Sequence, residues 1–215
     1  MTTFTPADHL GAVARAITTT VRDGREMRLL RVSRSYDATP EEVWAALTDR
    51  ERVPRWLMPI EGDLRVGGRF QLEGNAGGEI LACTPPKALQ VTWEYGGQSS
   101  WVDAALEPVD DGTRLVLEHA APVEPPELWE EFGPGAVGLG WELMLMGLAE
   151  HLADPTFTPP SPDTAPSPDI VDYLTASSHG WAEADASSGT DPAQARAAAE
   201  RCLTAYTTVP EDPGA

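Results

Sequence analysis

Apolar residues recur along the chain with two different periods, and each period predicts one kind of element. Between residues 137 and 153 they recur every three or four positions on two stripes, which is typical of a helix covered on more than one side. Between residues 62 and 119 short runs of alternating apolar and polar residues are separated by turn residues, which is typical of strands buried on one face. The pattern therefore predicts an α+β domain, in which an antiparallel meander packs on one long helix.

The segment 36–57 carries the clearest local signals. Thr39 and Glu42 have the spacing of a capping box, and Pro40 stands at the first helical position, where no backbone N–H is needed. Pro54 limits the helix that follows to a short piece. We therefore expect two short helices here, preceded by a strand over residues 26–36.

Both ends of the chain are expected to add helices. Apolar residues recur at helical spacing from Leu10 to Val21, so residues 1–24 are predicted to carry an amphipathic helix that ends at an Asp23-Gly24 turn. Residues 154–168 contain six prolines and predict an extended linker. Residues 169–215 predict a helical extension with a hairpin too small to have its own core. The hairpin is expected to dock on the main domain, or else to form a partner surface, through Trp181, Leu203 and Tyr206.

The order of these motifs resembles the family related to the activator of heat-shock protein 90 ATPase, within the START-like superfamily, also called Bet v-like or polyketide-cyclase-like. A strand leads to Tyr-Asp-Ala-Thr-Pro-Glu-Glu-Val-Trp, followed by Pro-Arg-Trp-Leu and Gly-Asp-Leu-Arg-Val-Gly-Gly-Arg-Phe. The resemblance covers residues 24–153 and implies a helix-grip fold, in which a curved antiparallel sheet wraps around a long C-terminal helix. It predicts a main domain over residues 25–153. Members of such a family share an architecture while their functions differ.

Charge and cysteine content narrow the expected partners. The 215 residues carry a formal net charge of -19, and Lys87 is the single lysine, so the cationic surface that nucleic acids or anionic membranes require is not expected. Cys83 and Cys202 lie far apart, which argues against a disulfide framework or a structural zinc site. The N-terminal residues lack a signal-peptide pattern, so we expect a cytoplasmic protein.

No motif predicts a catalytic, metal or cofactor site. Residues 133–138 spell G-x-G-x-x-G before a helix, but no buried strand precedes them, so we interpret these glycines as a flexible lead into the long helix that packs closely on the sheet. His119 and His151 do not have metal-ligand spacing. Neither Ser99 nor Ser100 stands in a nucleophile elbow.

The resemblance implies instead an apolar pocket between the concave face of the sheet and the long helix. By the parity of the strands and the helix stripe, the candidate lining residues are Trp56, Phe70, Trp93, Trp101, Leu117, Trp141 and Leu145. The candidate polar groups in this pocket are Arg69, Glu94 and His119. The alternative is that these large side chains fill the interior completely.

Three functions are consistent with this pattern. The first is a domain that binds a small hydrophobic or amphipathic molecule without a defined catalytic site. The second is a co-chaperone-like module that binds a protein partner and stimulates a chaperone ATPase, as the family name suggests. The third is an enzyme of the cyclase or hydrolase kind that uses a carboxylate or histidine of the same cavity.

Overall fold

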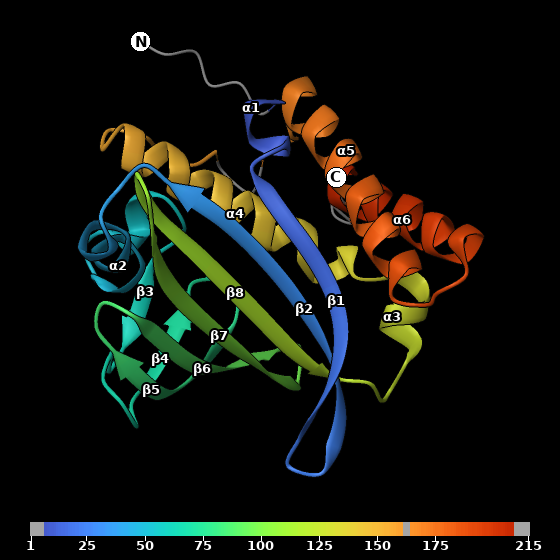
Figure 1. Ribbon diagram of the computed structural model, residues 1–215, viewed down its shortest axis with the longest axis horizontal. Coiled ribbons are helices and arrows are strands. Elements are labelled where there is room, and N and C mark those ends of the chain that lie inside the picture. The colour runs from blue at the N-terminus through green and yellow to red at the C-terminus, as the bar shows by residue number, and fades with distance from the viewer. Residues whose placement is uncertain (1–6, 161–163, 209–215) are drawn as a thin grey trace, which may run out of the picture.

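An eight-stranded antiparallel sheet wraps around one long helix in the computed structural model, which describes residues 7–160 and 164–208 (Figure 1). The strands are β1 (Val13–Arg22), β2 (Arg25–Tyr36), β3 (Ile60–Gly62), β4 (Arg69–Leu72), β5 (Gly77–Thr84), β6 (Ala88–Tyr95), β7 (Gln98–Val109) and β8 (Gly112–Pro122). They follow the order β1-β2-β8-β7-β6-β5-β4-β3. The helices are α1 (Ala7–Leu10), α2 (Pro40–Thr48), the 3-10 turn η1 (Val53–Arg55), α3 (Glu127–Phe132), α4 (Gly135–Ala153), α5 (Pro168–Ser187) and α6 (Pro192–Thr207). The predicted helix-grip fold is confirmed.

The first helix after β2 begins where the sequence predicts it. The Thr39 side chain accepts a hydrogen bond from the Glu42 backbone N–H, and the Glu42 carboxylate accepts one from the Thr39 backbone N–H at 2.9 Å. Pro40 occupies the first turn. This capping box fixes the direction of α2, which with η1 lies at one end of the sheet (Figure 1).

The predicted amphipathic helix over residues 1–24 is wrong for its described part. Residues 13–22 form strand β1, which pairs with β2 along its whole length, and only the four residues of α1 are helical. Val13 is buried, whereas Val21 is 71% exposed. The Asp23-Gly24 turn is confirmed, since both residues have positive φ and join paired strands, as a tight hairpin requires.

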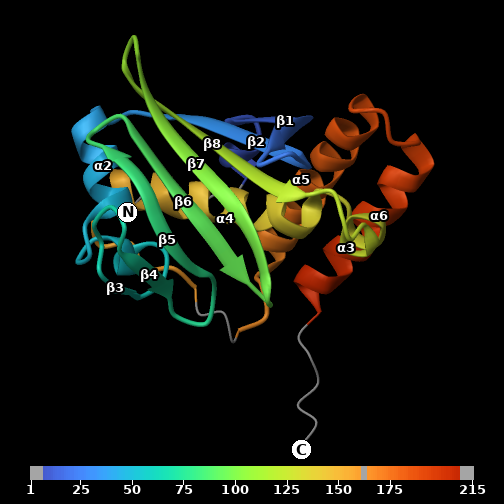
Figure 2. The same ribbon diagram turned by 90° about the horizontal axis from the view of Figure 1, so that it is seen from below.

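The C-terminal hairpin docks on its own domain. Helices α5 and α6 stack beside α4 and β1, as Figures 1 and 2 show. Trp181 is fully buried, and the Tyr206 hydroxyl donates a hydrogen bond to the Ala136 carbonyl at 3.1 Å. Residues 154–160 and 164–167, within the predicted linker, contain no helix or strand.

The glycines of residues 133–138 contact the hairpin rather than the sheet, which corrects our expectation. A Cβ atom on Gly138 would lie 2.4 Å from Trp181 Cε2, and one on Gly135 would lie 3.1 Å from Cys202 Sγ. Glycine is needed here because the indole ring packs directly on the helix backbone.

A buried ion pair joins the N-terminal strand, the long helix and the hairpin. The Arg15 guanidinium on β1 donates two hydrogen bonds of 2.6 Å to the Glu142 carboxylate on α4. The Tyr173 hydroxyl on α5 donates a third to the same carboxylate at 3.3 Å. Glu142 is fully buried.

Among the described residues, no helix is both long enough and apolar enough to cross a membrane.

Candidate functional site

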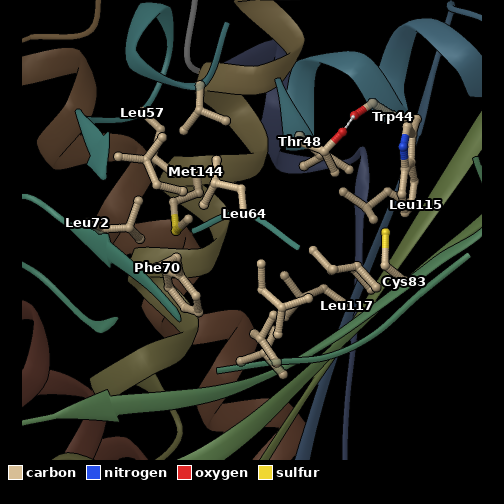
Figure 3. Close-up of a pocket in the computed structure, with 18 of the residues that line it drawn as sticks. Trp44, Thr48, Leu57, Leu64, Phe70, Leu72, Cys83, Leu115, Leu117 and Met144 are labelled. Carbon is tan, nitrogen blue, oxygen red and sulfur yellow. Dashed lines mark hydrogen bonds between the residues drawn. The ribbon is translucent and has the colours of Figure 1, made fainter. Parts of the chain in front are cut away.

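A cavity of about 450 Å³ lies between the concave face of the sheet, α2, η1 and α4. Figure 3 shows Trp44, Thr48 and Cys83 on one side of it and Leu57, Phe70 and Leu72 on the opposite side. Both sides are supplied by elements of the predicted domain, residues 25–153. The volume is within the range of small-molecule sites, so the large side chains do not fill the interior.

Six of the seven predicted apolar residues line this cavity: Trp56, Phe70, Trp93, Leu117, Trp141 and Leu145. They reach it from η1's C-terminal cap, three strands and α4. Two polar groups of this wall are engaged within the protein, since the Trp56 indole N–H donates to the Ala46 carbonyl at 3.0 Å and the Thr48 hydroxyl donates to the Trp44 carbonyl at 2.8 Å. The interior therefore offers an almost wholly apolar surface to a ligand.

The predicted residue Trp101 lies outside the cavity. The two-residue turn at Gly96-Gly97 pairs Trp93 with Ser100, which places Trp101 opposite Thr92 on the outer face of the sheet. There the Arg22 guanidinium carbon lies 4.8 Å from the centre of a Trp101 ring. The register of this hairpin, rather than strand alternation alone, decides which tryptophan points inward.

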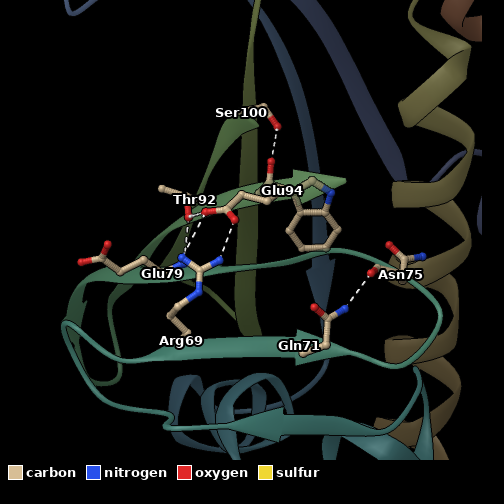
Figure 4. A network of polar contacts seen from close by, with 8 residues as sticks. Arg69, Gln71, Asn75, Glu79, Thr92, Glu94 and Ser100 are labelled. Carbon is tan, nitrogen blue, oxygen red and sulfur yellow. Dashed lines mark hydrogen bonds and ion pairs between the residues drawn. The ribbon is translucent and has the colours of Figure 1, made fainter. Parts of the chain in front are cut away.

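The predicted polar groups Arg69 and Glu94 also lie on the outer face. Their side chains form an ion pair of 2.6 Å and are 61% and 37% exposed (Figure 4). Because Phe70 and Trp93 point inward, their chain neighbours point outward. The hydrogen bond from Arg69 has the largest effect on the pKa of the Glu94 carboxyl and lowers it, and a hydrogen bond from Thr92 lowers it further. These two groups therefore support the sheet and do not contact the cavity.

His119 lies on the inner face but is separated from the cavity by two tryptophans. The Trp141 indole N–H donates to His119 Nδ1 at 3.0 Å, and His119 Nε2 contacts Ser100 Oγ at 2.8 Å. The Ser100 hydroxyl in turn donates to the Trp93 carbonyl at 3.0 Å. With Nδ1 accepting, the proton of the neutral ring lies on Nε2. This chain of hydrogen bonds fixes Trp93 and Trp141, whose ring centres lie 4.9 Å apart at one end of the cavity.

The buried position of His119 makes stability depend on pH. Burial lowers the pKa of His119 to about 4, so the unfolded chain takes up this proton first as the pH falls below about 6.5. We expect about 3 kcal/mol of unfolding free energy to be present above pH 6.5 and lost between pH 6.5 and 4. Urea unfolding of the wild type and of His119→Gln, which cannot titrate, checks this expectation. Equal slopes against pH for the two proteins would contradict it.

Strand β7 supplies lining residues that sequence reasoning missed. Val102, Ala104 and Leu106 alternate along this strand and all face the cavity. The register set by the Gly96-Gly97 turn would have predicted these three residues, because each lies an even number of residues from Ser100, which pairs with the inward-facing Trp93.

Cys83 also lines the cavity and is exposed. Among the described residues, no group of three or more histidine, cysteine, aspartate or glutamate side chains could hold a metal ion.

Comparisons with known proteins agree with this architecture. Residues 37–153 match the family described as Activator of Hsp90 ATPase homolog 1-like protein. The crystal structure of CalU16 from Micromonospora echinospora is 35% identical, with 81% of this chain and 99% of that chain covered and a TM-score of 0.65. The solution structure of CalU16 is 34% identical, with 88% of this chain and 100% of that chain covered and a TM-score of 0.68. Protein MLL2253 from Mesorhizobium loti is 28% identical, with 59% of this chain and 97% of that chain covered and a TM-score of 0.51.

The similarity to CalU16 extends beyond residue 153, since 88% of the 215 residues is more than the 153 residues that end with α4. No match is found among curated protein sequences. The family match spans more than half of the 215 residues and contains α2, most of the sheet and α4, the elements that enclose the cavity. The chain belongs to the Activator of Hsp90 ATPase homolog 1-like family.

Proposed function

We propose that the protein binds a small hydrophobic or amphipathic molecule in the cavity between the sheet and α4. The observation that carries this proposal is an apolar space of about 450 Å³ inside an otherwise closely packed core. Such a space costs stability when it is empty, because its lining side chains lose contacts on one side. An apolar ligand would restore these contacts and gain the free energy of burying its own surface.

We further propose that binding involves no chemical step. A general acid or base needs a titratable group within hydrogen-bond reach of the substrate. Both ring nitrogens of His119 are engaged by Trp141 and Ser100, and Glu94 lies on the outer face. Turnover of a bound molecule that is abolished by His119→Gln, with binding intact, would contradict this.

Native mass spectrometry of the purified protein tests the binding proposal directly. We expect one extra mass per chain, lost on denaturation and recovered by solvent extraction, because a site of this size holds one small molecule. A thermal-shift series with apolar probes extends the test to protein that has lost its ligand, since a ligand that binds only the folded state raises the melting temperature.

Two variants on one strand provide the matched control. Ala104→Phe adds a ring inside the cavity, whereas Ala105→Phe adds the same ring on the opposite face of β7. We expect Ala104→Phe to remove the bound mass and reduce probe affinity at least tenfold, and Ala105→Phe to leave both near the wild-type level. Equal binding by the two variants would place the ligand elsewhere and contradict the proposal.

The family match favours one second candidate, a module that stimulates a chaperone ATPase. The family is named after an activator of a chaperone ATPase, and such an activity would use a protein surface rather than the cavity. Titrating the protein into an ATPase assay with the chaperone of its host tests the candidate. Stimulation that is unchanged in Ala104→Phe would separate this activity from ligand binding, and no stimulation at saturating protein would remove the candidate.

A further inference from the structure

Arg65 is the single charged residue among those that line the cavity in the described part of the chain. It stands between Leu64 and Val66, which line the cavity as well. Its side chain is 78% exposed, so the guanidinium reaches solvent while the residue borders the apolar space. This arrangement marks the mouth of the cavity and places a positive charge there.

The backbone holds Arg65 in a fixed turn. The Arg65 carbonyl accepts a hydrogen bond from Gly68 N at 2.8 Å, and Gly67 N donates to the Ile80 carbonyl of β5 at 2.8 Å. A Cβ atom on Gly68 would lie 2.1 Å from the Asp63 carbonyl oxygen, so this turn requires glycine. The backbone of Arg65 therefore has a defined position at the mouth.

Part of the Arg65 guanidinium remains available for a ligand. Its Nε donates to Asp63 Oδ2 at 2.7 Å, which orients the planar group. The two terminal nitrogens form no hydrogen bond to the described residues and can donate two parallel hydrogen bonds to an acid group. Asp63 is itself 54% exposed, so solvent weakens its hold on the arginine.

The local charge near the mouth differs from that of the remaining chain. Residues 49–69 contain five of the 15 basic residues and four of the 34 acidic residues, so this segment is net +1 while the rest is net -20. The segment supplies seven lining residues, from Val53 to Val66. The segment that supplies the mouth therefore carries less negative charge per residue than the chain as a whole, which reduces the repulsion of an anion there.

We propose that the ligand is an amphipathic acid, whose apolar body fills the cavity and whose carboxylate, sulfonate or phosphate group binds the terminal nitrogens of Arg65. This inference rests on the proposed ligand-binding function and adds the chemical class and the orientation of the ligand. The acid group stays at the mouth, where water completes its solvation. The apolar body enters the interior, where the walls are almost wholly apolar.

A matched series of three fluorescent probes tests the inference: 1-pyrenebutanoic acid, its methyl ester and 1-pyrenebutylamine. Each is titrated with the 215-residue protein while the pyrene emission is recorded. We expect the wild type to bind the acid about fivefold more tightly than the ester, near the upper end of what one exposed ion pair contributes. The amine is expected to bind most weakly. The preference for the acid should shrink in high salt.

Three substitutions assign the preference to Arg65. Arg65→Gln should bind acid and ester equally while keeping its ester affinity, and Asp63→Asn should bind the acid more tightly because a competing charge is removed. Arg69→Gln, with the same charge change on the outer face, should behave like the wild type. A preference for the acid that survives in Arg65→Gln, or equal binding of acid and ester by the wild type, overturns the inference and leaves the proposed function standing. If no probe shows saturable binding that Ala104→Phe removes, the proposed function falls and the inference falls with it.

Discussion

Replacing Glu142 by glutamine is expected to lower the free energy of unfolding by about 3–5 kcal/mol, the largest effect we predict for a single polar change. Glu142 is fully buried, and the Arg15 side chain that it pairs with is only 14% exposed. Removing the carboxylate charge leaves the guanidinium buried without a counter-ion, and weakens the contact with the Tyr173 hydroxyl. Urea denaturation followed by circular dichroism measures the loss.

The chain contains a matched control for this prediction. The Arg69–Glu94 pair has the same 2.6 Å separation but lies exposed on the outer face, so Glu94→Gln is expected to cost less than about 1 kcal/mol. The double variant Arg15→Met/Glu142→Leu removes both buried charges and should be clearly more stable than Glu142→Gln alone. Similar losses for Glu142→Gln and Glu94→Gln would contradict the role we assign to burial.

Trp181→Ala is expected to destabilise the protein by about 3–5 kcal/mol and to loosen the C-terminal hairpin. The indole is fully buried and packs on the backbone of α4 at Gly138. Truncating it leaves a void that the rigid helix cannot close. Thermal unfolding reports the loss of stability, and hydrogen exchange of the α5 and α6 amides reports the loosening.

The effect of a second substitution on the free energy of unfolding should differ in sign between the wild type and the Trp181→Ala variant. This difference separates the close contact from general destabilisation. In the wild type, Gly138→Ala places a methyl group 2.4 Å from the Trp181 ring and is expected to destabilise. In the Trp181→Ala background the same methyl group occupies the void, and alanine favours the helix by about 1 kcal/mol over glycine, so it is expected to stabilise. Destabilisation by Gly138→Ala in both backgrounds would show that the close contact with Trp181 is not the cause.

Strand β1 shows why a periodic pattern alone misidentified the N-terminal segment. Val13, Ile17 and Val21 are four residues apart, a spacing that satisfies both the helical period and the period of two in a strand. The run of β-branched residues from Ile17 to Val21 favours a strand and was the signal that could have decided between them. Elements with two concordant signals, such as α2 with its capping box and β2 with its alternation, were predicted correctly.

The candidate site was predictable only where local sequence determines which way a side chain faces. Trp93 follows from the alternation within β6, whereas Trp101 required the register across a hairpin. The pairing of Arg15 with Glu142 joins residues 127 positions apart and depends on how β1, α4 and α5 assemble, so no local pattern indicates it. The volume of the cavity depends on the fit of many side chains at once, which periodicity does not specify.

The glycines of α4 bear on the order in which the chain folds. Gly135, Gly138, Gly140 and Gly147 each face a close neighbour, namely Cys202, Trp181, Tyr206 and Trp56. In the helix interior, Gly138, Gly140 and Gly147 each cost about 1 kcal/mol relative to alanine, so α4 has a low intrinsic tendency to form by itself. We therefore expect α4 to be stabilised mainly by its packing against the sheet and the hairpin. The family match ends at residue 153, but the unit that is expected to fold cooperatively extends through α6.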